Sequence, residues 1–181
     1  MIIARQKKKE NIAEYLLFMW QIEDLIRANG LDLDKIQSGI IDKFDQSEEA
    51  KKEIRDWYES LIDMMRREDK QQSGHLQINQ NVIIDLTDLH LQLIHSNKEP
   101  FYVAAYYKTL PFIVELRARA GELQTGEIET CFSALYGVLM LRLRGQAVSE
   151  ETMKAIKQIS TFLGLLSDKY KEDRAGELDK D

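Results

Sequence analysis

The residues best placed to do chemistry form a narrow polar strip on a helix expected over residues 78–96. At about 100° per residue, five polar side chains fall within a strip about 80° wide. The strip contains Asn81, Asp85, Asp88, Gln92 and His95. Apolar side chains fill a broad face of this helix, and Ile84 and Leu91 form a second apolar patch. Such a helix is either a core helix with one edge in water or the wall of a polar cavity. Both interpretations stay open, and in the second the strip is a candidate binding site.

The spacing of the histidines argues against a metal site on this strip. Di-iron bundles place a His three residues after a Glu, so that both side chains reach one ion. None of the three histidines has an acid three or four residues before it. Asp88 and His95 lie about 10 Å apart along a helix axis, which is too far for one ion. We expect no metal site and no cofactor, and we interpret His90 as a hydrogen-bonded histidine among apolar neighbours.

Pairs of acidic residues spaced three apart give one enzymatic alternative. All-α nucleotide pyrophosphohydrolases hold magnesium with two such pairs, mostly of Glu, on neighbouring helices, and oxygen ligands suit that ion. Here Glu53/Asp56 and Asp85/Asp88 are faintly similar to that arrangement. They depart from it in residue type, and Asp56 points away from the apolar stripe of its helix. A magnesium-dependent hydrolase is therefore the rival hypothesis, and no catalytic residue is assigned.

Aromatic residues gather around a proline in a helix expected to start at Pro100. The candidate pocket residues are Tyr102, Tyr106, Tyr107 and Phe112. Pro111 removes one backbone hydrogen bond and leaves a carbonyl in need of a partner. Rings, phenol groups and an open carbonyl could bind a small ligand. The alternative is core packing with tyrosine hydroxyls at its edge.

Composition and missing motifs exclude several common classes of protein. The sequence has no Gly-rich phosphate loop, nucleophile elbow, C-x-x-C or H-E-x-x-H motif, and no basic recognition helix. The net charge of -6 disfavours nucleic acid as a partner. The longest apolar run, residues 134–141, is too short to span a membrane, and no secretory signal is visible. Cys131 is the single cysteine. We expect a soluble cytoplasmic protein.

Start and stop signals divide the chain into six or seven helices. The expected N-caps are Asp34, Ser47, Thr125 and Ser149, and the expected ends are Asn29-Gly30, Ser73-Gly74, Ser96 and Gly145. Pro111 is expected to kink or restart its helix, with Thr109 as the new cap. Short connections favour antiparallel neighbours. The prediction is an all-α, single-domain bundle over residues 1–172, followed by a polar, disordered tail over residues 173–181.

The charge distribution suggests which helices lie at the centre. Residues 76–148 hold 13 charged side chains in 73 positions, whereas 31% of the whole chain is charged. Ionised side chains are rarely buried without a partner. We therefore expect helices from this low-charge stretch to be surrounded by helices from the charged flanks.

Three segments resemble an uncharacterised bacterial family, a domain of unknown function with all-helical members of about this length. The segments are residues 1–15 (MIIARQKKKENIAEY), 19–28 (MWQIEDLIRA) and 135–145 (LYGVLMLRLRG). The resemblance implies a helical fold over most of the chain. It brings no activity and no site residues.

The favoured function is that of an interaction or scaffolding module that associates with itself. Two features motivate this hypothesis: the second apolar patch at Ile84 and Leu91, and a first helix that is apolar around most of its girth, with Trp20 as an anchor. The expected partner is a second copy or another protein, with no nucleic acid and no membrane. The alternatives are the magnesium-dependent hydrolase and a regulator that binds a small ligand.

Overall fold

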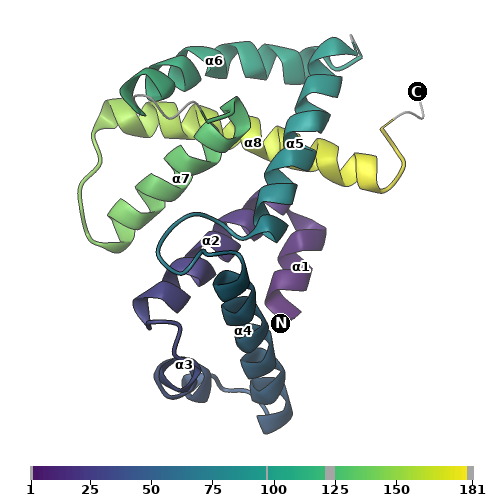
Figure 1. Ribbon diagram of the computed structural model, residues 1–181. Helices are drawn as coiled ribbons and strands as arrows, with labels where there is room; N and C mark the ends of the chain where they lie inside the picture. The colour runs from purple at the N-terminus through teal and green to yellow at the C-terminus, as the bar shows by residue number, and fades with distance from the viewer. Residues whose placement is uncertain (1, 97, 121–124, 179–181) are drawn as a thin grey trace. The chain divides into compact units, whose positions relative to one another are not determined.

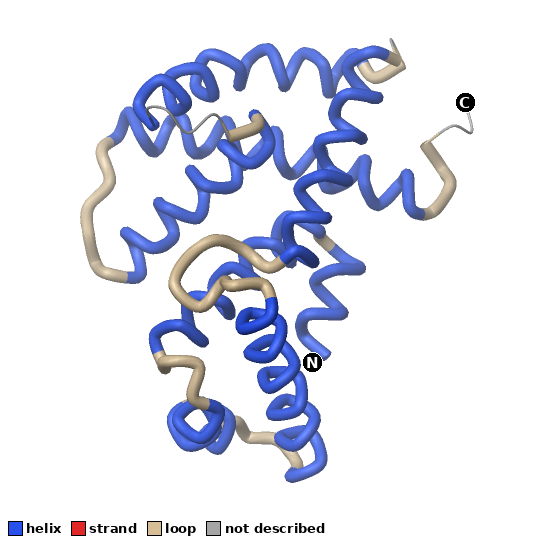
Figure 2. The backbone as a smooth tube through the Cα atoms, in the orientation of Figure 1, coloured by secondary structure: helices blue, strands red, loops and turns tan. Residues whose placement is uncertain are grey.

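The regular structure of this chain is entirely helical in the part that is described (Figures 1 and 2). The computed structural model describes residues 2–96, 98–120 and 125–178. The elements in chain order are α1 (Ile2–Glu10), α2 (Ile12–Ala28), α3 (Leu33–Gly39), the 3₁₀ helix η1 (Ile41–Lys43), α4 (Glu48–Arg67), α5 (Gln77–His95), α6 (Pro100–Ala120), α7 (Glu127–Leu143) and α8 (Glu150–Arg174). The predicted all-α class is confirmed. These residues form eight α-helices, not six or seven. One reason is that helical structure is interrupted at Asn11, so the expected first helix is two helices, α1 and α2.

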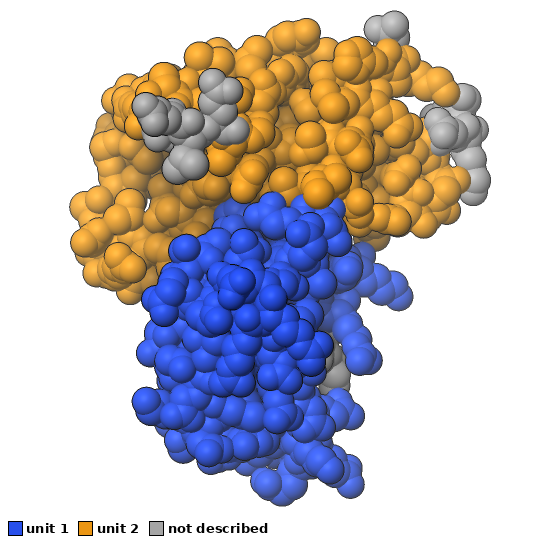
Figure 3. Space-filling view, in the orientation of Figure 1, with its two compact units in different colours: residues 1–10, 14–81 blue, residues 11–13, 82–181 orange. Residues whose placement is uncertain are grey.

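The helices belong to two compact units (Figure 3). Unit 1 comprises residues 1–10 and 14–81, and unit 2 comprises residues 11–13 and 82–181. Whether residues 1–172 fold as one domain stays a prediction. The predicted tail begins inside α8, which continues through Arg174, and residues 179–181 lie outside the described part. No helix of the described residues is long and apolar enough to cross a membrane.

Helix boundaries in unit 1 follow capping chemistry, with two corrections. Ser47 caps α4 as predicted, because its hydroxyl accepts a hydrogen bond from the Ala50 N–H. The cap of α3 is Asp32, not Asp34: its carboxylate accepts the N–H groups of the two residues at positions 34 and 35. The predicted end of α4 at Ser73-Gly74 was wrong. The helix ends at Arg67, and Asp69 adopts a left-handed conformation with φ 55° soon after.

In unit 2, α6 packs mainly on α8, and α7 packs against both (Figure 1). Of the two alternatives predicted at Pro111, a kink or a restart, the restart with Thr109 as cap was wrong, since α6 is continuous through Pro111. The Thr109 hydroxyl donates to the Ala105 carbonyl at 2.8 Å and caps nothing. Pro111 is exposed, so water can replace the hydrogen bond that proline cannot donate.

The ends of the last two helices are set by short polar residues. Ser149 caps α8 as predicted, with its hydroxyl accepting the Thr152 N–H. For α7 the cap residue is Gly126 and not Thr125. The Thr125 hydroxyl instead lies 3.0 Å from the Thr130 hydroxyl, so it is already engaged with a side chain of the first turn.

The low-charge stretch, residues 76–148, both buries and exposes apolar side chains. It buries Leu86, Tyr102 and Phe132, while Trp20 and Phe162 from the charged flanks are buried as well. Of the described residues, eight large hydrophobic side chains are exposed, and all but Ile3 belong to this stretch. The seven are Ile78, Ile84, Leu91, Phe101, Tyr107, Val114 and Leu143. The stretch therefore contains few charged residues for two reasons: some of its side chains are buried, and some of its exposed side chains are apolar.

Candidate functional site

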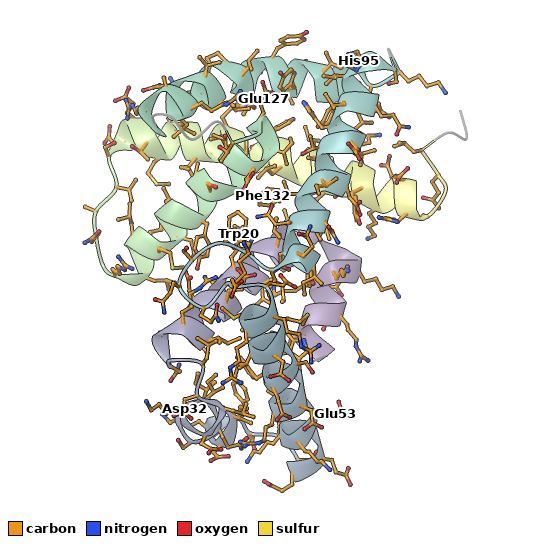
Figure 4. The ribbon with its side chains drawn as sticks, in the orientation of Figure 1. Trp20, Asp32, Glu53, His95, Glu127 and Phe132 are labelled. Carbon is orange, nitrogen blue, oxygen red and sulfur yellow. The ribbon has the colours of Figure 1, made fainter. Side chains whose placement is uncertain are left out.

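The polar strip of α5 faces outward. Its five side chains are Asn81, Asp85, Asp88, Gln92 and His95, and all are exposed. Asp85 accepts a hydrogen bond from Arg174 at 2.8 Å, and the His95 ring donates to the Leu91 carbonyl at 2.6 Å (His95 is labelled in Figure 4). An exposed edge of a helix needs polar side chains only for solvation. The geometry therefore favours the solvent-edge interpretation over the cavity wall, and binding at the strip stays a prediction.

The four aromatic candidates on α6 do not share one pocket. Tyr102 is 2% exposed and Tyr107 is 63% exposed. Phe112 borders a small cavity of ≈ 70 Å³ between α6 and α8. Tyr106 is half-buried and donates a hydrogen bond from its hydroxyl to Glu127 at 2.9 Å. The spacing placed these residues on one helix, but their faces on that helix differ, so they meet different neighbours.

Two of these tyrosines surround a buried histidine. The hydroxyl of Tyr102 lies 2.7 Å from Nδ1 of His90, and the ring of Tyr106 lies 4.8 Å from the His90 ring, centroid to centroid. Phe162 of α8 closes the group, with its ring 5.8 Å from His90. Glu127, labelled at the start of α7 in Figure 4, accepts the Tyr106 hydrogen bond. We call this group of residues the His90 cluster. His90 is hydrogen-bonded among apolar neighbours, as the sequence predicts.

Burial keeps the His90 cluster uncharged at its centre. It lowers the pKa of His90, an effect that the charge of Glu127 opposes and His95 reinforces. It also raises the pKa of Tyr106 to about 12, together with the hydrogen bond to Glu127. Nearby, burial raises the pKa of the Cys131 thiol to about 12, so this cysteine is a protonated core residue and no nucleophile.

The acidic residues of the rival enzyme hypothesis do not assemble a metal site in the described structure. Glu53 and Asp56 are exposed on α4, and Asp85 is paired with Arg174 (Glu53 is labelled in Figure 4). Among the described residues, no group of three or more His, Cys, Asp or Glu side chains could hold a metal ion. Nothing in this geometry supports the magnesium hydrolase.

A buried carboxylate in unit 1 escaped the sequence analysis. Glu23 of α2 is 0% exposed. Its Oε2 lies 2.6 Å from Nδ1 of His75, and its Oε1 accepts the Leu76 N–H at 2.9 Å and the Asn79 amide at 2.6 Å. Trp20, one turn earlier on α2, stacks on the His75 ring with centroids 4.0 Å apart. We call these residues the Glu23 cluster.

The Glu23 cluster holds the segment that precedes α5 against α2 through hydrogen bonds. The carboxylate accepts the backbone N–H of Leu76, directly before α5, and the side-chain amide of Asn79 in its first turn, where the helix dipole favours a negative charge. Arg27, one turn further on α2, donates to the carbonyls of Lys70 and Gly74 in the same connection. The Glu23 carboxylate accepts from three donors of the chain itself, so its evident role is structural.

One sequence signal could have found this acid. At about 100° per residue, Glu23 falls in the middle of the stripe formed by Ile12, Leu16, Met19 and Ile26. An acid on the apolar face of a helix must either be paired or stay at the surface. Its partner His75 lies 52 positions away in a loop, and no local pattern predicts that pairing.

The outer face of α6 is an exposed apolar surface of unit 2. Its exposed residues include Ala104, Tyr107, Pro111, Val114 and Ala118, which we call the outer stripe. Tyr107 and Val114 are 63% and 58% exposed, and Phe101 beside them is 87% exposed. The second apolar patch predicted on α5 is also exposed, at 52% for Ile84 and 46% for Leu91.

Trp20 does not contribute to this surface. Trp20 was expected to anchor self-association, but it is 2% exposed and its ring packs on His75. That expectation was wrong, because the apolar side chains of α2 are buried within the chain. Tyr15, Leu16, Met19 and Ile22 are buried as well.

The fold and these surfaces define an all-α protein whose buried polar groups serve its own structure and whose exposed apolar residues concentrate on α5 and α6. The chain belongs to the family described as Domain of unknown function (DUF4924), which matches residues 1–177. Membership confirms the predicted resemblance to a domain of unknown function. No curated protein and no solved structure matches the chain.

Proposed function

We propose that this protein is an interaction module that binds a second copy of itself through apolar surface on unit 2. The observation that carries the proposal is the location of the exposed large hydrophobic residues: of the eight in the described part, six lie in unit 2. Isolated exposed apolar residues need no explanation, but a concentration of them on neighbouring elements is typical of a binding surface.

The outer stripe is the part of this surface best suited to binding a helix. Its residues recur at alternating intervals of three and four, so they line one side of α6. The stripe contains no charged residue, and Tyr107 and Phe101 are aromatic residues of the kind enriched at interfaces. A helix face of this type is buried most simply by another helix.

A second copy is the partner favoured by symmetry. In a two-fold dimer the same patch meets itself, so an uncharged apolar stripe is its own complement. A different protein with a matching apolar helix is the other partner that the sequence analysis allowed. The two differ in one observable property, because only self-association makes the mass of the purified protein depend on its concentration.

The test is the molar mass of the purified protein by sedimentation equilibrium across the micromolar range. Wild type should approach twice the mass of one chain, and Val114→Glu should weaken the association at least about tenfold, because a charge would be buried in the contact. Ile84→Gln removes an exposed apolar residue of the same surface on α5, so comparing it with Val114→Glu shows which of the two helices carries the main contact. Wild-type protein that stays monomeric throughout this range would overturn the proposal.

The association assay is informative only if the variants fold. Both substitutions change exposed side chains, so helix content and thermal midpoint should stay close to wild type. If Ile84→Gln weakens association more than Val114→Glu does, the main contact lies on α5 and not on α6.

We include a cytoplasmic location in the proposal, as the sequence analysis predicts. The chain has a single cysteine, Cys131, so it cannot form a disulfide within itself, and this cysteine is buried. Fractionation of cells that produce the tagged protein tests this part, and recovery outside the cytoplasm would contradict it.

A further inference from the structure

We infer that two copies pair through their α6 helices in an antiparallel arrangement, in the register that sets Lys108 opposite the partner's Glu115. This inference rests on the proposed self-association and specifies its geometry. The features that carry it are the spacing of the outer stripe, the sizes of its residues and the charges along its edge.

The spacing of the stripe matches the contact line of paired helices. Ala104, Tyr107, Pro111, Val114 and Ala118 follow intervals of three, four, three and four residues. This pattern places residues alternately at the two core positions of a heptad. All five are exposed, while Tyr102, Thr109 and Ile113 on other faces of α6 are buried. The stripe thus belongs to the side of α6 that the rest of unit 2 leaves open.

Residue sizes along the stripe fit an antiparallel partner. When two such helices run in opposite directions, the two kinds of core position face each other. Tyr107 then meets the partner's Ala118, and Pro111 meets the partner's Val114. The largest side chain faces the smallest, and the two-fold axis repeats each contact. In a parallel pair, Tyr107 and Pro111 would each face their own copies.

Charges along one edge of the stripe select the same register. Lys108 and Glu115 are exposed on the same flank and lie seven residues apart, about 10 Å along the helix axis. In the antiparallel register each lies beside the oppositely charged residue of the partner, so one dimer contains two such pairs. Glu115 also accepts a hydrogen bond from Arg119 of its own helix, and a carboxylate can accept from a second donor such as the partner's Lys108.

The other edge of the stripe offers no competing charge pattern. It carries Leu110 and Arg117, both partly exposed. The Arg117 guanidinium lies 3.9 Å from Glu127 of α7, so its charge already has a partner within the chain. A parallel arrangement would set Leu110 beside the partner's Glu115, so Glu115 would not meet an opposite charge at that position. Only the antiparallel register uses both charges of the exposed flank.

Charge exchange tests the register. Lys108→Glu and Glu115→Lys each create two like-charge contacts, and each should raise the dissociation constant of the dimer about tenfold or more at low salt. The double variant Lys108→Glu/Glu115→Lys restores two opposite-charge pairs and should bind within about threefold of wild type. If the loss of binding free energy in the double variant equals the sum of the losses in the two single variants, the proposed register is wrong.

Disulfide trapping distinguishes the two directions independently of charge. A mixture of the Tyr107→Cys and Ala118→Cys variants should cross-link as a heterodimer, because these positions face each other. The Tyr107→Cys variant alone should not cross-link, since its two thiols would be about 16 Å apart along the axis. Cross-linking of Tyr107→Cys with itself would overturn the antiparallel inference and leave self-association standing. A wild-type protein without any dimer would instead remove the proposed function.

Discussion

The two units bury a titratable side chain in opposite ways. In unit 1, Glu23 is completely enclosed and meets three donors, on His75, Leu76 and Asn79. In unit 2, His90 is 3% exposed and has one close polar partner, the Tyr102 hydroxyl, amid aromatic rings. The Glu23 cluster therefore satisfies an acid with several donors, whereas the His90 cluster keeps a base neutral.

This contrast implies different tolerance to substitution. A buried acid that holds several donors cannot be replaced by an apolar residue without leaving those donors unsatisfied. A neutral pair among apolar neighbours can be replaced on both sides by apolar groups of similar shape at little cost. The Glu23 cluster should therefore be irreplaceable, and the His90 cluster should be replaceable as a pair.

The largest effect is expected for Glu23→Ala. The substitution strands the Leu76 N–H, the Asn79 amide and the His75 ring, so it should lower the free energy of unfolding by about 3–5 kcal/mol. Urea unfolding followed by circular dichroism measures this change. Glu14→Ala, on the exposed face of the same helix, is the matched control and should change stability by less than about 1 kcal/mol. Equal effects of the two substitutions would show that the buried acid has no special role.

A smaller effect is expected in the His90 cluster. Tyr102→Phe removes the hydroxyl at 2.7 Å from His90 and leaves a buried ring nitrogen without that partner, which should cost about 1–3 kcal/mol. Adding His90→Leu to Tyr102→Phe should recover part of this loss, because neither polar atom then remains. A double-mutant cycle in urea measures the coupling. If the losses in the free energy of unfolding caused by the two single substitutions simply add in the double variant, the two residues are not a neutral pair that can be replaced together.

The smallest effect is a difference in pH dependence. Burial lowers the pKa of His90 below its ordinary value of 6.5, so below that pH the unfolded chain binds a proton that the folded chain refuses. The free energy of unfolding should thus fall as pH falls below about 6.5, by at most about 1.4 kcal/mol per pH unit from this group. The variant His90→Leu/Tyr102→Phe should show a shallower slope than wild type in urea melts between about pH 7 and about pH 5. Parallel slopes would mean that His90 titrates alike in both states.

Some helix boundaries could be predicted because their causes lie within a few residues. Ser47 and Ser149 cap the helices that follow them, since a hydroxyl reaches a backbone N–H three residues away. The choice of Asp32 over Asp34 as a cap was missed, because both are acidic and only the backbone conformation distinguishes them. The sequence left open whether α6 kinks or restarts at Pro111, and α6 is continuous, since a proline can be accommodated where its helix face is open to water.

Candidate site residues were harder to predict than boundaries. Helical spacing correctly placed Tyr102 and Tyr107 on one helix, but it could not say that one is buried and the other exposed. The weakly charged stretch suggested a core, and the structure exposes part of it as the outer stripe. Apolar composition is the same for a core and for a binding surface, so the distinction requires knowing which face a neighbouring helix covers.

The sequence by itself determined that this chain is all-α and where several of its helices begin. These properties follow from periodicity and capping, which act over one or two turns. Only the tertiary structure decided that Glu23 binds His75 across 52 positions, that Trp20 is buried and that one face of α6 stays open. Contacts between residues distant in the chain depend on how helices pack, and no local pattern encodes which face each helix presents to its neighbours.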